Sequence, residues 1–198
     1  MLFKKPSSIS WLIVGLGNPG REYEKTRHNV GFRVAELLAE RAGVKIDRAK
    51  FRALTRQAEV GGCRVLLVKP QTFMNLSGEA VFLAGQFYKL PPERIVLVFD
   101  DVSLPLGRVR VRESGSAGGH NGVKSVLAQL GSDRVPRVKV GVGEKPHPDM
   151  DLADWVLSRF TPAEEKTVAE AAERAADAVE ALISQGVPAA AAKFNGKP

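Results

Sequence analysis

The chain has 198 residues, of which 44% are apolar and 26% are charged, a composition typical of globular proteins rather than of disordered or fibrous ones. The net charge is +7, and all of the excess positive charge lies in the first 150 residues, because residues 151–198 hold 5 Lys and Arg against 8 Asp and Glu. A basic surface attracts polyanions such as nucleic acids, although many soluble proteins are mildly basic. The single cysteine excludes an intramolecular disulfide, and the absence of a Cys/His cluster with zinc spacing argues against a zinc site. The longest apolar run is far below the ~20 residues that a membrane helix needs, so no membrane span is predicted.

The first half of the chain predicts alternating strands and helices. A buried strand enters a glycine-rich loop, a helix with apolar residues at helical spacing follows, and a hairpin forms around Gly61-Gly62. The next helix is predicted to begin at Ser77 as its N-cap and to end before Pro91-Pro92. The predicted ranges are 11–14 for the first strand, 30–41 for the helix, 53–60 and 64–69 for the hairpin, and 77–89 for the second helix.

The second half continues this alternation. Residues 95–99 are all apolar, which indicates a central strand that is covered on both faces. Residues 108–112 alternate arginine with valine, which indicates a half-exposed strand. A glycine-rich turn at 115–122 leads into a helix closed by Gly131, and a capping box begins the last long helix. The ranges that remain are 123–130 for the helix, 138–142 for a strand, and 161–186 for the last helix.

Strands that alternate with helices indicate an α/β fold, with a twisted, mixed and mostly parallel sheet and helices on both faces. No repeat, linker or low-complexity block divides the chain, so we expect a single domain over residues 11–187. Residues 1–10 are predicted to form a short N-terminal tail, and residues 188–198 a flexible C-terminal tail. The unpaired Cys63 favours a reducing, cytoplasmic compartment.

Polar side chains follow successive strand ends. In open α/β sheets, functional residues lie in the loops beyond the carboxyl ends of the strands. These loops carry three amides, two imidazoles and two carboxylates, which can supply a base, its orienting carboxylate and amides that hold a carbonyl substrate. No serine stands in a nucleophile elbow, so the predicted chemistry is water activated by a histidine. The residues concerned are Asn18, His28, Asn75, Asp100, Asp101, His120 and Asn121.

Each of these residues also has a structural interpretation when it is considered alone. Asn18 fits a turn, His28 fits a helix cap or an inward-packed ring, and Asn75 and Asn121 fit turns or caps. Asp100 fits a carboxylate that binds loop amides at a strand end. Their joint placement at successive strand ends favours a shared site.

The loop Gly15–Gly20 matches the pattern G-x-G-x-x-G, so a nucleotide-dependent enzyme is one alternative. That pattern binds a dinucleotide when a helix starts within the glycines and an acidic residue follows about 20 positions later, at a strand end. Here the helix begins only near Val30, and Glu36 and Glu40 lie inside it. The context therefore argues against a nucleotide cofactor.

Five separated sequence blocks lie between about residues 12 and 160. They are Val14–Gly20, Tyr23 with Thr26–Gly31, Lys69–Gly78, Asp100-Asp101 with Leu104–Gly107, and Gly115–Gly122. In this order they resemble the bacterial-type peptidyl-tRNA hydrolase family. The resemblance implies a monomeric α/β enzyme that hydrolyses the ester between a peptide and the 3′ ribose of tRNA, without a metal or an organic cofactor.

The resemblance also implies roles for individual residues. His28 would be the general base, and Asp100 would orient it. Tyr23 and Met74 would line the peptide cleft, although as isolated residues they fit core packing better. Asn18, Asn75 and Asn121 would position the peptide, its carbonyl and the water. Arg112 and Lys139 would contact tRNA phosphates, and the alternative for these two residues is a solvated strand face.

Three positions depart from the commonest pattern of the family. An acidic residue is usual at Ser103, histidine or tyrosine at Phe99, and arginine at Lys139, where lysine keeps the charge but loses the bidentate contact. A non-catalytic RNA-binding module on the same scaffold is a second alternative. The joint presence of His28 and Asp100 disfavours it, because phosphate binding needs neither residue.

Overall fold

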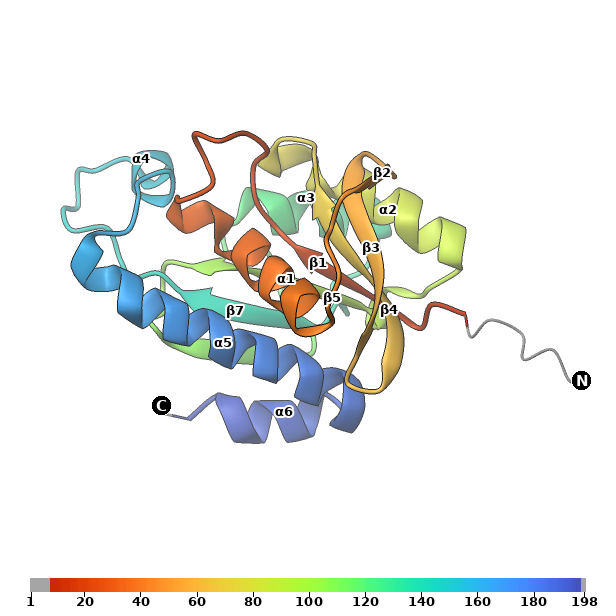
Figure 1. Cartoon of the computed structure of the whole chain (residues 1–198). Coiled ribbons are helices and arrows are strands. Elements are labelled where there is room, and N and C mark those ends of the chain that lie inside the picture. Colours follow the sequence, from red (N-terminus) through yellow and green to blue (C-terminus); the bar gives the residue numbers. More distant parts are fainter. Residues whose placement is uncertain (1–7, 197–198) are drawn as a thin grey trace, which may run out of the picture.

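The structure is a computed structural model that describes residues 8–196 (Figure 1). These residues form a seven-stranded mixed sheet in the order β2-β3-β4-β1-β5-β7-β6. The four strands β4, β1, β5 and β7 run parallel, and the pairings β2–β3, β3–β4 and β6–β7 are antiparallel. The strands are β1 Trp11–Gly15, β2 Arg48–Lys50, β3 Ala53–Val60, β4 Cys63–Pro70, β5 Ile95–Asp101, β6 Val109–Arg112 and β7 Arg137–Gly141.

Helices cover both faces of the sheet, so the predicted α/β class is confirmed. Apolar residues of α1, α5 and α6 form the core on one face, and those of α2 and α3 form the core on the other; Figure 1 shows α1 and α5 in front of the sheet. The helices are α1 Val30–Arg41, α2 Ser77–Tyr88, α3 Asn121–Leu130, α4 Leu152–Val156, α5 Pro162–Gln185 and α6 Val187–Phe194, with 3-10 turns η1 Arg27–Asn29, η2 Met74–Leu76 and η3 Pro92–Arg94. No helix within residues 8–196 has the length and apolar composition needed to cross a bilayer.

The strands follow from their side-chain patterns. β5 is buried from Ile95 to Asp100 because β1 and β7 flank it and helices cover both its faces. In β6 the valines are buried, while Arg110 is half-buried and Arg112 is exposed, as the alternating pattern predicts. The two glycines between β3 and β4 both have positive φ, which glycine adopts without strain.

The close approach of α1 to the sheet positions the loop that precedes it. A Cβ atom on Gly31 would lie 2.3 Å from the carbonyl oxygen of Val98 and 2.5 Å from that of Leu16. Only glycine allows this contact, because backbone atoms cannot give way to a side chain at such distances. The first turn of α1 therefore lies against β5 and the end of β1, and η1 is placed over the carboxyl edge of the sheet.

The structure differs from the sequence predictions at both ends of the chain. Residues 187–194 form α6 where a flexible tail was predicted, with Ala190 and Phe194 buried, and the Asn195 side chain bonds the backbone of Val111 on β6. Tertiary packing holds this alanine-rich segment. At the other end, Ile9 is buried within the predicted N-terminal tail, while residues 1–7 and 197–198 lie outside the described residues.

Three further differences concern short elements and one helix start. The sequence did not predict β2 or α4, which have only three and five residues. The N-cap of α2 is Leu76 rather than Ser77. Ser77 is the first helical residue, and its hydroxyl donates to the carbonyl oxygen of Met74 at 2.8 Å instead of capping the helix.

Candidate active site

A cavity of about 560 Å³ opens at the carboxyl edge of the sheet. Its walls come from the loops after β1, β4 and β5, from the turn before α3, and from α4. Chain segments far apart in sequence thus meet at one place, as the strand-end rule predicts. Seven of the nine residues to which the resemblance assigns a role line it: Asn18, His28, Met74, Asn75, Asp100, Asn121 and Lys139.

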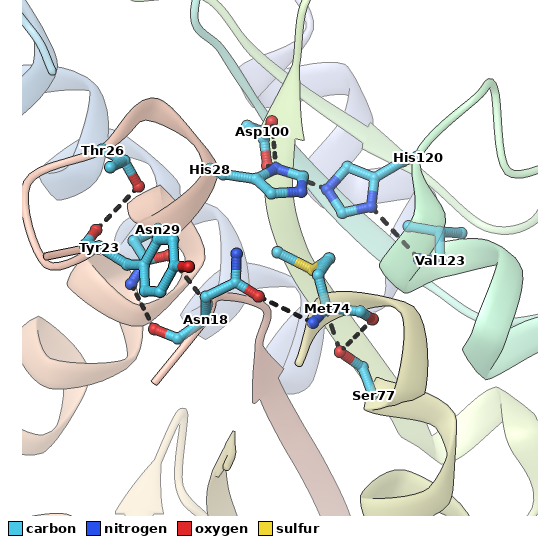
Figure 2. Close-up of polar contacts among 10 residues, drawn as sticks. All are labelled: Asn18, Tyr23, Thr26, His28, Asn29, Met74, Ser77, Asp100, His120 and Val123. Carbon is cyan, nitrogen blue, oxygen red and sulfur yellow. Dashed lines mark hydrogen bonds and ion pairs between the residues drawn. The ribbon is translucent and has the colours of Figure 1, made fainter. Parts of the chain in front are cut away.

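His28 and Asp100 form a hydrogen-bonded pair in this cavity. The Nδ1 atom of His28 lies 2.9 Å from Oδ1 and 3.0 Å from Oδ2 of Asp100, and Figure 2 shows the ring joined to the carboxylate by a dashed line. An ionised carboxylate only accepts, so Nδ1 carries the proton and Nε2 keeps its lone pair. This tautomer leaves Nε2 as the basic atom of the ring.

Asp100 is held by a second imidazole. The Nε2 atom of His120 donates to Oδ1 of Asp100 at 2.9 Å, and the backbone N–H of Val123 donates to Nδ1 of the same ring at 3.3 Å. The helix terminus of α3 thus selects the neutral tautomer of His120 that can donate to the carboxylate. The sequence placed His120 at a helix start but did not assign it this role.

The two imidazoles keep Asp100 ionised. Asp100 is 3% exposed, and burial by itself raises the pKa of a carboxyl group. Electrostatic attraction to His120 and His28 and the hydrogen bonds from both rings act in the opposite direction and dominate, so the pKa of Asp100 lies well below its usual range. The carboxylate is therefore charged at neutral pH.

Three groups of this cluster, His28, Asp100 and His120, also have the composition of a metal site. One ligand atom from each lies within 4.8 Å of the others. Binding an ion through His120 Nε2 would move the proton to Nδ1, where it would face the N–H of Val123. The observed hydrogen bonds therefore favour a carboxylate shared by two imidazoles over a metal centre.

Asn18 is oriented by its neighbours. Its side-chain oxygen accepts from the backbone N–H of Met74 at 2.8 Å, so the amide nitrogen is the end left for a ligand. The side chain of Asn29 accepts from the backbone N–H of Asn18 and donates to its carbonyl oxygen, both at 2.9 Å. Figure 2 shows these contacts beside His28. Asn29 is a positioning residue that the sequence prediction missed.

Asn75 and Asn121 also line the cavity, from η2 and from the start of α3. Both are exposed, and within residues 8–196 neither side chain has a hydrogen bond to the protein. Their amides are available to a substrate. Next to Asn121, a Cβ atom on Gly122 would lie 2.5 Å from the sulfur of Met74, so any larger residue there would displace the Met74 side chain that lines the cavity.

Two predicted contact residues lie outside the cavity lining. Tyr23 is half-buried, and its carbonyl oxygen accepts from the hydroxyl of Thr26 at 2.8 Å. Arg112 pairs with Arg137 at the amino end of β7, away from the carboxyl edge of the sheet where the cavity opens. Lys139 does line the cavity, where its ammonium group forms an ion pair with Asp101 at 3.0 Å.

The η1 turn that carries His28 is anchored by a buried arginine. Arg27 is 2% exposed and donates to both carboxylate oxygens of Glu164, at 2.9 and 3.1 Å, and to the hydroxyl of Ser158. Its guanidinium lies 3.7 Å from the ring centroid of Trp155. These contacts tie η1 to α4 and α5, and no sequence motif pointed to them.

The fold and the cavity define the class of the protein: a mixed-sheet α/β enzyme with a histidine–aspartate pair in a cleft lined by amides. The family model described as peptidyl-tRNA hydrolase matches residues 12–198. The chain belongs to the peptidyl-tRNA hydrolase family, and it is a hydrolase that acts on an ester bond.

Individual relatives agree with this assignment. The chain is 50% identical to the peptidyl-tRNA hydrolase of Chloroflexus aggregans, over 93% of this chain and 98% of the relative, and 49% identical to that of Caldanaerobacter subterraneus, over 94% and 100%. The crystal structure of peptidyl-tRNA hydrolase from Acinetobacter baumannii superposes with a TM-score of 0.88 at 33% identity, and covers 96% of this chain and 97% of that one.

Proposed function

We propose that the protein hydrolyses the ester bond between the peptide and the 3′ ribose of peptidyl-tRNA, with water activated by His28. The observation that carries this mechanism is the hydrogen bond of His28 Nδ1 to Asp100, which leaves Nε2 unprotonated in the cavity. A neutral imidazole nitrogen within reach of a water molecule can act as a general base. The proposed reaction uses no metal or organic cofactor.

The chemistry has two proton transfers. Nε2 of His28 takes a proton from water as the water oxygen attacks the ester carbonyl. The bond from the carbonyl carbon to the 3′ oxygen then breaks, and the 3′ oxygen receives the proton from His28, so that free peptide and tRNA leave. Asp100 stabilises the transient imidazolium, while the amides of Asn18, Asn75 and Asn121 hold the peptide, the carbonyl and the water.

The activity itself is tested by release of an N-blocked amino acid from N-acetyl-aminoacyl-tRNA. Free aminoacyl-tRNA is the control substrate. Rapid release from the blocked substrate alone supports the proposal. No release from either substrate would contradict it.

Asp100→Asn is expected to lower turnover, but less than loss of His28 does. The new amide oxygen can still accept at the position of Oδ1, whereas its NH₂ group would face the protonated Nδ1 of His28 and stabilise the imidazolium poorly. The loss therefore stays below the about 10²–10⁴-fold that general acid–base catalysis supplies. Steady-state kinetics measure it.

The matched control for this substitution is Asp101→Asn. Asp101 faces away from the imidazoles: its Oδ1 accepts from the backbone and hydroxyl of Ser103, and its Oδ2 pairs with Lys139. We expect this variant to keep its turnover. A silent Asp100→Asn together with a damaged Asp101→Asn would mean that the other carboxylate orients the base.

The partner is proposed to be peptidyl-tRNA, bound by a cytoplasmic monomer that returns tRNA to translation. Arg112 and Lys139 are proposed to contact tRNA phosphates through charge, without reading bases. Arg110 pairs with Lys139 across β6 and β7, so the two proposed contacts are joined by a basic strand. This surface lies on the β7–β6 side of the cavity.

Arg112→Ala is expected to raise the KM for full-length peptidyl-tRNA and to reduce the slope of its logarithmic salt dependence by about 1, the value for one lost phosphate contact. Hydrolysis of a minimal peptidyl-adenosine ester should stay unchanged, because that substrate has no distant phosphate. The same measurements on Lys139→Ala test the proposed phosphate contact that lies at the cavity. If Arg112→Ala impairs both substrates equally, Arg112 supports the fold rather than tRNA binding.

A further inference from the structure

Large exposed apolar side chains are concentrated around the cavity. Six of them, between 40% and 59% exposed, occur within residues 8–196. Three line the cavity, and the other three continue from it into α2. The cavity residues are Phe73, Leu152 and Leu157, and the others, here called the α2 strip, are Leu76, Leu83 and Phe87.

The members of the α2 strip lie on one side of their helix. Leu76 directly precedes α2, and Leu83 and Phe87 follow 7 and 11 positions later. At about 100° per residue Leu83 and Phe87 lie within about 40° of each other on α2, and Leu76 lies in η2 directly before the helix. At about 1.5 Å per residue the three positions span about 16 Å. Because the N–H of Leu76 bonds the carbonyl oxygen of Phe73, the strip begins at the cavity wall.

The far end of the strip meets the turn between β2 and β3. The ring of Phe51 lies 5.2 Å from that of Phe87, and the ammonium of Lys50 lies 3.8 Å above the Phe87 ring. Arg52 forms an ion pair with Glu79 on α2. The strip is thus an apolar surface with polar groups along its edge, the arrangement of a binding surface rather than of scattered exposed residues.

The order of the strands separates this surface from the proposed tRNA contacts. β7 and β6 lie on one side of β5, which carries Asp100, while β4 leads into α2 on the other side. The tRNA and the peptide are attached to opposite sides of the ester bond, so they extend from His28 in different directions. With tRNA on the side of Lys139, the peptide leaves toward α2.

We propose that the α2 strip binds apolar side chains of the peptide upstream of the esterified residue. This inference rests on the proposed function. A nascent peptide is unfolded and exposes such side chains, and at about 3.3 Å per residue a 16 Å strip accommodates about five extended residues. The strip contacts no reacting atom, so it contributes the same binding energy to substrate and transition state, and it changes KM rather than turnover.

The test compares three substrates on one tRNA. The first carries a single N-acetyl amino acid, the second an N-acetylated octapeptide with leucine and phenylalanine upstream of the ester residue, and the third an octapeptide with serine and glycine there. The variant is Leu83→Gln with Phe87→Gln, and the matched control is Gln86→Ala, at an exposed polar position of α2 outside the strip.

The double variant is expected to raise the KM for the apolar octapeptide about 10-fold, since burial of one such side chain already accounts for that factor. Its kcat for this substrate should stay unchanged, as should all constants for the other two substrates and for Gln86→Ala. Both replaced side chains are exposed, so the melting temperature should not fall; if it does, Leu83→Gln alone is measured instead.

Each other outcome overturns the inference. An unchanged KM for the apolar octapeptide would show that the strip does not bind peptide, and an equal rise for all three substrates would show that it supports the cavity. Self-association of the wild-type protein that the double variant abolishes would assign the strip to a second copy of the chain. Failure of the proposed function is distinct, because wild-type protein would then leave the single-residue substrate intact.

Discussion

His28→Ala is expected to lower the rate of ester hydrolysis by about 10²–10⁴-fold, the range that a positioned general base supplies. His28 lies in the short η1 turn, and its side chain contacts Asp100 rather than the apolar core. Removal of the ring therefore eliminates the atom proposed to accept a proton from water. The fold should remain, since Asp100 keeps its hydrogen bond to His120.

Single-turnover hydrolysis of N-acetyl-aminoacyl-tRNA measures this effect, and thermal unfolding measures the fold. His147 is the matched control, because it is exposed and lies outside the cavity lining. His147→Ala should retain full activity. If His28→Ala keeps activity within a few-fold of the wild type, His28 is not the base.

Arg27→Ala is expected to reduce the free energy of unfolding by about 3 kcal/mol, the lower end of the range for breaking a buried ion pair, because Glu164 retains contact with water. The substitution removes both hydrogen bonds to Glu164 and the contact with Trp155. It should also reduce turnover, since His28 is the next residue along η1.

Denaturant titration at several pH values tests this role. Burial raises the pKa of Glu164, but its bond to Arg27 dominates and holds the pKa below the usual range. The pair therefore stabilises the fold at neutral pH, and its contribution is lost as the pH falls below about 4.3, the ordinary value for glutamate. As the pH falls through that interval, Arg27→Ala should lose less free energy of unfolding than the wild type.

The neighbouring ion pair supplies the control. Arg33 bonds Glu165 at 3.0 Å, and both side chains are about 40% exposed. Arg33→Ala should cost less than about 1 kcal/mol, as exposed ion pairs do. An equal loss of unfolding free energy in the two arginine variants would show that the buried ion pair of Arg27 does not anchor η1.

Most of the regular elements could be predicted because local patterns encode them. The apolar run of β5 requires cover on both faces, the paired glycines between β3 and β4 require a turn, and the Thr161 capping box begins α5. The segment of α6 has helix signals, a proline in its first turn and four consecutive alanines, but eight residues are too few for a stable helix in isolation. It is held in place because Ala190 and Phe194 pack into the core, which the sequence of residues 188–198 does not reveal.

The residue types at the site were predictable, but the hydrogen bonds between their side chains were not. The strand-end rule brings Asn18, His28 and Asp100 to one edge, because parallel strands end together. The roles of His120 and Asn29 depend on side-chain geometry that spacing does not define.

By itself, the sequence determined the α/β class, the order of most strands and helices, and the residue types that meet at the carboxyl edge of the sheet. It did so because hydrophobic periodicity, glycine and proline act over a few neighbouring residues. Only the tertiary structure decided that two imidazoles share one carboxylate, that Arg27 anchors η1 through Glu164, and that Arg112 lies away from the cavity. These contacts join positions many residues apart, and their energies depend on burial and orientation, which exist only once the chain has folded.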